Sequence, residues 1–228
     1  MTAEDFLKGQ IILIDKPLEW SSFQVVNKIR WLLKKKYKLK KIKVGHTGTL
    51  DPLATGLLII CTGKKTKQIA EFQGLEKTYK GSFYIGATTP SYDSEHPINK
   101  RFPTEHITLE KLETTRLQFI GEILQKPPIF SALKKDGKRL YEIARTGKYV
   151  EIEQRKITIH SFTLEKIVLP LIKFEVCCSK GTYIRSLAND FGKSLKSGAY
   201  LSELRRTAIG DFHIKTAKTI EDFERSIQ

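Results

Sequence analysis

Glycine and proline are concentrated in residues 44–63, where they occupy five positions. Glycine lets the main chain approach its neighbours where a Cβ would obstruct it, and proline removes a hydrogen-bond donor from a strand or helix. We therefore predict a loop over the first half of this stretch and a strand only over the apolar run 57–61. Asp51 lies in the loop, directly before Pro52. It either caps the turn that Asp-Pro pairs favour or faces a ligand that the glycines allow to come close.

Apolar spacing in the rest of the chain predicts strands and helices in an irregular order. Ser21 and Gln24 have the spacing of a capping box, so we expect a helix to begin there and to end in the lysine block, residues 34–43. The other predicted elements are strands over 11–14, 79–85 and 172–178, a helix from Thr108 to Gln118 with Leu109, Leu112 and Leu117 facing inward, and helices over 184–195 and 220–227. Because strands and helices do not alternate regularly, we predict an α+β fold with a mainly antiparallel sheet.

The charge balance indicates a polyanionic partner. The formal net charge is +15, from 40 Lys and Arg against 25 Asp and Glu. An excess of this size favours nucleic acid ahead of an acidic membrane. Residues 1–50 hold eleven basic and four acidic side chains, and seven of the basic ones belong to the lysine block. This block is either a surface that faces phosphates or a solvated loop.

Cysteine content and hydropathy narrow the class of protein further. Three cysteines, two of them adjacent, suit neither a disulfide framework nor a metal site, which favours a reducing compartment. No stretch approaches the roughly 18 apolar residues of a membrane helix. The N-terminus also lacks the apolar centre of a signal peptide. We therefore expect a cytoplasmic protein.

Four further motifs carry candidate functional side chains. Tyr183 and Arg185 follow a glycine where a strand meets a helix, so they either project toward a cleft or belong to an ordinary joint with an exposed arginine. Tyr79 opens a strand, where an aromatic side chain by itself most often belongs to the core or its rim. Segments 15–17 and 127–134 are by themselves a turn and a basic loop.

The ordered set of motifs resembles the tRNA pseudouridine synthase B (TruB) family. The motifs are Asp-Lys-Pro at 15–17, Gly-His-Thr-Gly-Thr-Leu-Asp-Pro-Leu-Ala-Thr-Gly at 45–56, Lys-Thr-Tyr at 77–79, the segment 127–134 with 137–140, and Gly-Thr-Tyr-Ile-Arg at 181–185. The resemblance covers about residues 9–210, and the long string is highly specific. It implies the pseudouridine synthase fold: a mainly antiparallel mixed sheet with flanking helices and loops around a central RNA-binding cleft. It also implies a single catalytic domain over residues 1–228.

The same resemblance implies an isomerase that converts uridine to pseudouridine. Asp51 would act on the ribose as a nucleophile or as a base, and Arg185 would keep its carboxylate ionised. Tyr79 would stack on the target base and help to remove the C5 proton. The substrate-binding positions implied are Lys16, Tyr183, Leu204 and His46, the last packing against RNA as the base leaves its stack. Neither an organic cofactor nor a metal is implied.

The implied substrate is the T-arm of tRNA, with the modified uridine in the T-loop. The basic segment 127–147 and the lysine block would supply phosphate contacts. We expect a monomer that uses no guide RNA, because guide-dependent relatives have extra domains. The alternative is an RNA-binding or tRNA-folding module with secondary or lost catalysis, which the retention of Asp51, Tyr79 and Arg185 disfavours.

Two departures from the family pattern affect the expected binding. Only 24 residues follow Leu204, too few for the C-terminal RNA-binding PUA domain that many relatives carry. We therefore expect tRNA binding that is weaker or differently anchored. Pro90 stands where relatives often carry Asp, which leaves open whether Asp93 is structural or contacts RNA.

Overall fold

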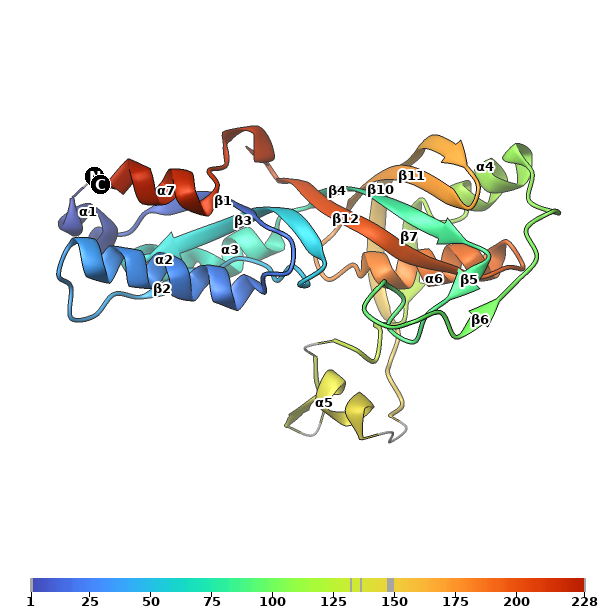
Figure 1. Ribbon diagram of the computed structural model, residues 1–228, viewed down its shortest axis with the longest axis horizontal. Helices are drawn as coiled ribbons and strands as arrows, with labels where there is room; N and C mark the ends of the chain where they lie inside the picture. The colour runs from blue at the N-terminus through green and yellow to red at the C-terminus, as the bar shows by residue number, and fades with distance from the viewer. Residues whose placement is uncertain (1, 132, 136, 147–149, 228) are drawn as a thin grey trace. The chain divides into compact units, whose positions relative to one another are not determined.

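The computed structural model describes residues 2–131, 133–135, 137–146 and 150–227, which form two compact units (Figure 1). Unit 1 consists of Met1–Lys80 and Leu204–Gln228, and unit 2 consists of Gly81–Glu203. Helices and mainly antiparallel strands occur in mixed order, which confirms the predicted α+β class. None of the helices in these residues has both the length and the apolar character needed to cross a bilayer.

Unit 1 is a sheet covered by helices on both faces. Its elements are α1 (Ala3–Lys8), β1 (Ile11–Lys16), α2 (Ser22–Lys36), β2 (Val44–His46), β3 (Ala54–Thr62), η1 (Gly63–Gln68), α3 (Ile69–Gly74), the start of β4 (Lys77–Ile85), the end of β12 (Ala199–Ile209), β13 (Phe212–His213), η2 (Ile214–Thr216) and α7 (Ile220–Ile227). The predicted helices after Ser21 and over 220–227 are confirmed, and Ser21 and Gln24 form the predicted capping box.

β3 lies at the centre of unit 1 and is buried on both faces. Leu58 and Ile60 join the core formed with α2 and α7. Leu57, Ile59 and Cys61 pack on the opposite side, against residues of α3. Burial on both faces accounts for a continuous apolar run without alternation. The predicted strand over 57–61 was too short, because β3 begins at Ala54, and the predicted loop also contains β2.

Pairing with neighbouring strands explains the extra length of β3. β1 and β2 pair with it antiparallel, β1 from Ile11 opposite Cys61 to Lys16 opposite Gly56. β12 pairs with it in parallel, with Leu204 opposite Ala54 and Arg206 opposite Gly56. Gly56 has φ +104°, and a Cβ there would lie 2.3 Å from the Arg206 carbonyl oxygen. Only glycine therefore permits this pairing without displacement of the main chain.

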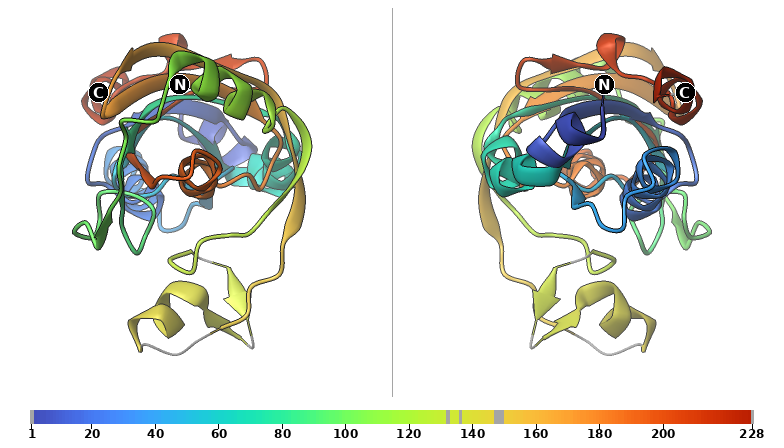
Figure 2. Two further views of the ribbon diagram at one scale, coloured as in Figure 1. Left: turned by 90° about the vertical axis from the view of Figure 1, so that its right-hand side faces the viewer. Right: turned by 90° about the vertical axis from the view of Figure 1, so that its left-hand side faces the viewer.

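Unit 2 combines antiparallel strands with two longer helices. Its elements are the rest of β4 and β12, β5 (Ala87–Thr88), β6 (Lys100–Arg101), α4 (Leu109–Leu117), β7 (Gly121–Gln125), β8 (Lys134–Lys135), β9 (Lys138–Arg139), α5 (Leu140–Arg145), β10 (Arg155–Val168), β11 (Leu171–Cys178) and α6 (Ile184–Ser194). β10 pairs antiparallel with both β7 and β11. Figure 2 shows α5, in yellow, on the excursion that connects β7 to β10.

Five phenylalanine rings pack together in the core of unit 2. Phe83 of β4 lies 4.1 Å from Phe174 of β11 and 5.7 Å from Phe191 of α6, centroid to centroid. Phe162 and Phe119 complete the cluster around Phe191. Such aromatic pairs contribute about 0.5–1.5 kcal/mol each beyond the burial of their area. The cluster holds α6 against the strands and so sets the position of the residues at its N-terminus.

Sequence patterns predict no strand at β7, β10 or β12. They predict the bounds of α4 correctly but assign two of its leucines to the wrong face. Thr108 caps α4 and Leu112 is buried as predicted, but Leu109 and Leu117 are 65% and 57% exposed. Leu117 follows Leu112 by five residues, which turns it about 140° away around a helix of 3.6 residues per turn. β12 escapes prediction because charged residues interrupt its apolar alternation.

Replacing Gly56 by alanine tests the close approach of β3 to β12. We expect Gly56→Ala to lower the free energy of unfolding by about 2–4 kcal/mol, because the new Cβ overlaps main-chain atoms of Arg206 at a positive φ. Urea unfolding followed by circular dichroism measures the change. Gly74→Ala is the matched control, since a Cβ at Gly74 meets nothing within 4 Å. Equal stability of the two variants would contradict the argument.

Candidate active site

Asp51 lies in the segment between β2 and β3, and hydrogen bonds fix the main chain on both sides of it. The Leu50 amide donates to the Ser22 hydroxyl at 2.8 Å, and the same hydroxyl lies 3.0 Å from the Leu50 carbonyl oxygen. The Ala54 amide donates to the Asp51 carbonyl oxygen at 3.0 Å. Leu50 is buried, whereas Asp51 is half-buried. The main chain around Asp51 is therefore held in place, while the residue keeps partial access to solvent.

Lys16 is fully buried at the end of β1, and its side chain contacts the segment that carries Asp51. Its ammonium donates to the carbonyl oxygens of Pro17, Trp20 and Pro52. Burial lowers the pKa of Lys16 to about 8, with the charge of Asp51 raising it and that of Arg206 lowering it further. The Pro52 carbonyl follows Asp51 directly, so Lys16 acts on the position of Asp51. Its predicted contact with substrate stays a prediction.

Arg206 lies on β12, the strand beside β3, and holds Gly48 near the start of the segment that carries Asp51. Its buried guanidinium donates to the carbonyl oxygens of Leu57, at 2.8 Å, and Gly48, at 3.0 Å. The Gly48 amide in turn donates to Nδ1 of His46 at 3.2 Å. Burial, and then the charge of Arg206, lower the pKa of His46, so the neutral imidazole that can accept this bond is favoured.

The other predicted residues of unit 1 lie on the two strands that continue into unit 2. Leu204 is half-buried on β12, and its carbonyl oxygen accepts from the Thr55 hydroxyl at 3.4 Å. Arg205 makes a two-pronged ion pair with Asp15, at 2.6 and 3.1 Å. Tyr79 on β4 is 8% exposed. Its predicted stacking on the target base stays a prediction.

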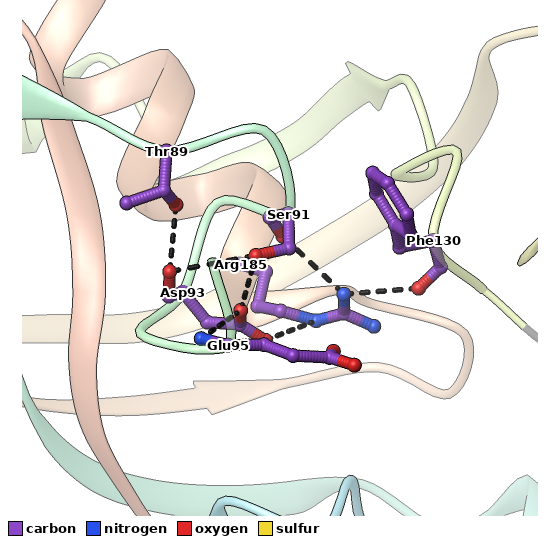
Figure 3. A network of polar contacts seen from close by, with 6 residues as sticks. All are labelled: Thr89, Ser91, Asp93, Glu95, Phe130 and Arg185. Carbon is purple, nitrogen blue, oxygen red and sulfur yellow. Dashed lines mark hydrogen bonds and ion pairs between the residues drawn. The ribbon is translucent and has the colours of Figure 1, made fainter. Parts of the chain in front are cut away.

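In unit 2, Arg185 lies in the first turn of α6 and is 5% exposed (Figure 3). Its guanidinium donates to the carbonyl oxygens of Phe130, at 3.0 Å, and Ser91, at 3.3 Å. Its Nε lies 3.6 Å from a carboxylate oxygen of Asp93. Three contacts from two separate segments therefore orient the arginine.

Asp93 is itself held by a compact set of hydrogen bonds, which Figure 3 shows. The Ser91 hydroxyl and the Glu95 amide donate to its carboxylate, the latter at 3.0 Å. The Thr89 hydroxyl donates to its carbonyl oxygen at 2.6 Å. Asp93 is 6% exposed, so its charge is directed at Arg185 and at these donors rather than at solvent. Of the two readings left open for Asp93, this geometry favours the structural one.

Tyr183 is the residue that caps α6, and its main chain is clamped by a buried glutamine. The Tyr183 amide donates to the Gln125 side chain at 2.8 Å, and that side chain donates back to the Tyr183 carbonyl oxygen at 3.1 Å. The clamp fixes the start of α6, two residues before Arg185. Tyr183 is half-buried, and its predicted contact with substrate stays a prediction.

The predicted site residues thus fall into two groups. Lys16, His46, Asp51, Tyr79 and Leu204 belong to unit 1, and Tyr183 and Arg185 belong to unit 2. The pairing of Arg185 with Asp51 stays a prediction. Among the residues that the structure describes, no cluster of three His, Cys, Asp or Glu side chains could hold a metal ion.

Three supporting residues of the site were missed by sequence reasoning: Ser22, Gln125 and Arg206. One signal was available for Arg206. It lies between Leu204 and Ala208 at a spacing of two, so the strand period places a charged side chain on the same face as apolar ones. Ser22 and Gln125 offer no comparable signal, because their partners are distant in the sequence.

The chain matches two family models in succession. Residues 34–184 match the TruB family pseudouridylate synthase (N terminal domain), and residues 185–228 match the tRNA pseudouridylate synthase B C-terminal domain. It is 63% identical over 229 residues to tRNA pseudouridine synthase B of Flavobacterium johnsoniae, covering 100% of each chain. It is 52% identical over 219 residues to the protein of the same name from Phocaeicola vulgatus, covering 96% of this chain and 93% of that protein.

Solved structures share the fold at lower identity. One chain of a Cbf5-Nop10-Gar1 complex superposes with a TM-score of 0.72 and 27% identity, covering 99% of this chain and 56% of that one. A chain of an H/ACA RNP bound to a substrate RNA containing 2'-deoxyuridine gives a TM-score of 0.69 and 26% identity, covering 96% and 53%. The present chain therefore spans about half the length of these two solved chains.

The pH dependence of stability tests the burial of Lys16. Because its pKa is about 8 in the folded protein against an ordinary 10.5, the unfolded state binds more protons between these values and stability rises with pH there. Lys16→Met lacks this contribution. From about pH 8 to 10.5 we expect the unfolding free energy of the wild type to rise by about 2–3 kcal/mol relative to the variant. A constant difference in urea unfolding across that range would contradict the assignment.

Proposed function

The chain belongs to the TruB family of pseudouridylate synthases, and on this premise we propose that it isomerises the uridine at position 55, in the T-loop of tRNA, to pseudouridine. In this reaction the bond from C1′ of the ribose to N1 of the base breaks, the base turns, and C1′ bonds to C5. The C5 proton leaves and N1 gains a proton, so no group is transferred to another molecule. The reaction needs positioning, containment and proton transfer.

Asp51 supplies the reactive carboxylate in this proposal. It acts toward the ribose either as a nucleophile that forms a temporary covalent bond or as a base that removes a proton. The observation that carries the proposal is the fixed main chain on either side of Asp51, held by Ser22, Lys16 and Arg206. A rigid support of this kind keeps a reacting group within the narrow range of productive geometries.

Arg185 is the proposed partner of the Asp51 carboxylate. A guanidinium beside a carboxylate favours its ionised form through charge and hydrogen bonding. Asp93 and two carbonyl oxygens orient Arg185 within unit 2, which supports a role in which its direction matters. Tyr79 stacks on the everted base and helps to remove the C5 proton, while Tyr183 and Leu204 line the pocket.

The target uridine belongs to a folded loop, so the enzyme extracts it at an unstacking cost of a few kcal/mol. His46 packs against the RNA at the place in the stack that the target base leaves. The pKa of His46 is lowered by burial, so the neutral ring can pack against a base without desolvating a charge. The lysine block and the basic segment 127–147 provide the salt-dependent phosphate contacts.

The enzyme acts on tRNA as a monomer and without a guide RNA in this proposal. The two relatives that match over 100% and 93% of their length bear the name tRNA pseudouridine synthase B, which supports direct recognition of tRNA. The chain of the H/ACA RNP structure is about twice as long, so what it assembles with need not apply here. The alternative, an RNA-binding or tRNA-folding module, requires basic surface but no reactive carboxylate.

The decisive experiment uses an unmodified tRNA transcript labelled with tritium at C5 of uridine. We expect the wild type, with no guide RNA added, to release tritium from the T-loop uridine. Asp51→Asn should bind the transcript but release essentially no tritium, because the amide can neither attack nor take a proton. Asp211→Asn, on an exposed residue, is the matched control and retains activity. Binding without any tritium release by the wild type would favour the RNA-binding module instead.

Asp93→Asn tests the orientation of Arg185. Loss of the carboxylate charge loosens the arginine, so we expect kcat to fall by up to about 10²-fold with little change in KM, since the substrate itself is not contacted. Single-turnover rates on the same transcript give the measurement. A variant with unchanged kcat and raised KM would instead identify Asp93 as an RNA contact.

A further inference from the structure

α2 presents aromatic and basic side chains to solvent on the side opposite its core face. Its aliphatic residues are buried in unit 1: Val25, Val26, Ile29, Leu32 and Leu33. Phe23 and Trp31 are 64% and 49% exposed. Phe23 and Trp31 are eight residues apart, a spacing that keeps them on one side of a helix. Together with the exposed Lys34 and Lys35, these two aromatic residues are called the α2 face below.

Two lysine side chains flank the Trp31 ring. The Nζ atoms of Lys28 and Lys35 each lie 4.8 Å from the centroid of the indole ring. Lys28 also faces Glu224 at 3.6 Å, so its charge is partly compensated. Between Glu19 and Asp51 the sequence contains nine Lys and Arg and no acidic residue. A partner with exposed negative charge therefore complements this surface.

The α2 face starts beside the candidate active site. Ser22, the first residue of α2, is the one whose hydroxyl bonds Leu50 next to Asp51. From Phe23 the face continues along the helix to Lys35, a distance of about 18 Å at 1.5 Å per residue. A molecule that presents a nucleotide to Asp51 and extends along α2 would therefore meet the aromatic rings and lysines in turn.

We propose that the α2 face is a second contact surface for the tRNA substrate, outside the nucleotide that reacts. Trp31 stacks on an unpaired base, and Lys34 and Lys35 neutralise phosphates. This inference rests on the proposed function for the identity of the RNA. Exposed aromatic rings flanked by cations are the combination that binds unstacked bases together with their backbone.

Charge argues against the other occupants of such a surface. A second copy of this chain also carries a net charge of +15, so association through two basic faces would be opposed by repulsion. An uncharged apolar partner would desolvate Lys34 and Lys35 without compensation. RNA satisfies both the rings and the ammonium groups.

Two kinds of variant separate stacking from electrostatics. The measurement is the dissociation constant for an unmodified tRNA transcript at several salt concentrations. We expect Trp31→Ala to raise the dissociation constant about tenfold with an unchanged salt slope, and Trp31→Phe to stay close to the wild type. The double variant Lys34→Ala, Lys35→Ala should make the dependence of the log association constant on log salt less steep, by roughly 1.5, because two phosphate contacts are lost.

Matched controls remove the same chemistry from other exposed positions. Lys166→Ala with Lys173→Ala changes the net charge equally, on paired positions of β10 and β11. Leu117→Ala removes an apolar side chain that is 57% exposed on α4. We expect both controls to bind as the wild type does. Equal losses in these controls would show a general charge effect and overturn the proposal.

Fluorescence gives a readout that does not require a folded Trp31 variant. The chain has two tryptophans, so Trp20→Phe leaves Trp31 as the sole indole. Stacking on a base predicts saturable quenching by tRNA with the same dissociation constant as direct binding. Absence of quenching at saturating tRNA would overturn the assignment of Trp31. Quenching by anionic lipid vesicles but not by tRNA would do the same in favour of a membrane surface.

The outcomes keep this proposal distinct from the proposed function. If the wild type binds tRNA and Trp31→Ala weakens binding, the α2 face is supported even where no pseudouridine forms. If pseudouridine forms and the Trp31 and lysine variants bind normally, the α2 face is excluded while the enzyme assignment stands. Trp31→Ala that changes only the oligomeric state in analytical ultracentrifugation would identify the face as a contact between copies, and overturn the proposal.

Discussion

The parallel pairing of β12 with β3 is the constraint on which the candidate active site of unit 1 depends. It brings Arg206 opposite Gly56, and the absence of a Cβ at Gly56 allows the two main chains to meet. The pairing also places the Arg206 guanidinium on the Gly48 carbonyl oxygen, at the start of the segment that carries Asp51. A strand from near the C-terminal end of the chain thereby sets the geometry of a loop near its beginning.

Buried cations hold both groups of site residues by the same means. Lys16 and Arg206 donate to carbonyl oxygens of the segments they support, and Arg185 donates to two carbonyl oxygens besides facing Asp93. A buried charge is tolerated only when its hydrogen bonds are satisfied, so each cation restricts the loops around it to conformations that present those oxygens. Desolvation of the buried ammonium is the main cause of the lowered pKa of Lys16. Positive charge close to the site also suits a substrate that carries phosphates.

Local signals were sufficient to predict several elements, and insufficient for others. The capping box at Ser21 and the helical spacing after it predicted α2, and alternation predicted β4 and β11. β12 was not predicted, because Arg206 is a charge in a buried strand position that only its carbonyl partners make tolerable. β3 was predicted too short, because its first residues pair with β1 and β12, which come from elsewhere in the chain.

The sequence by itself determined the mixed α+β class, the basic character of the protein and, through its ordered motifs, the family and the candidate residues Asp51, Tyr79 and Arg185. These properties follow from the composition, from the spacing of apolar residues and from short motifs of neighbouring residues. Only the tertiary structure decided how those residues are supported. The bonds from Ser22 to Leu50 and from Arg206 to Gly48 join residues 28 and 158 positions apart. No local pattern encodes such contacts, because each exists only once the sheet has brought its strands together.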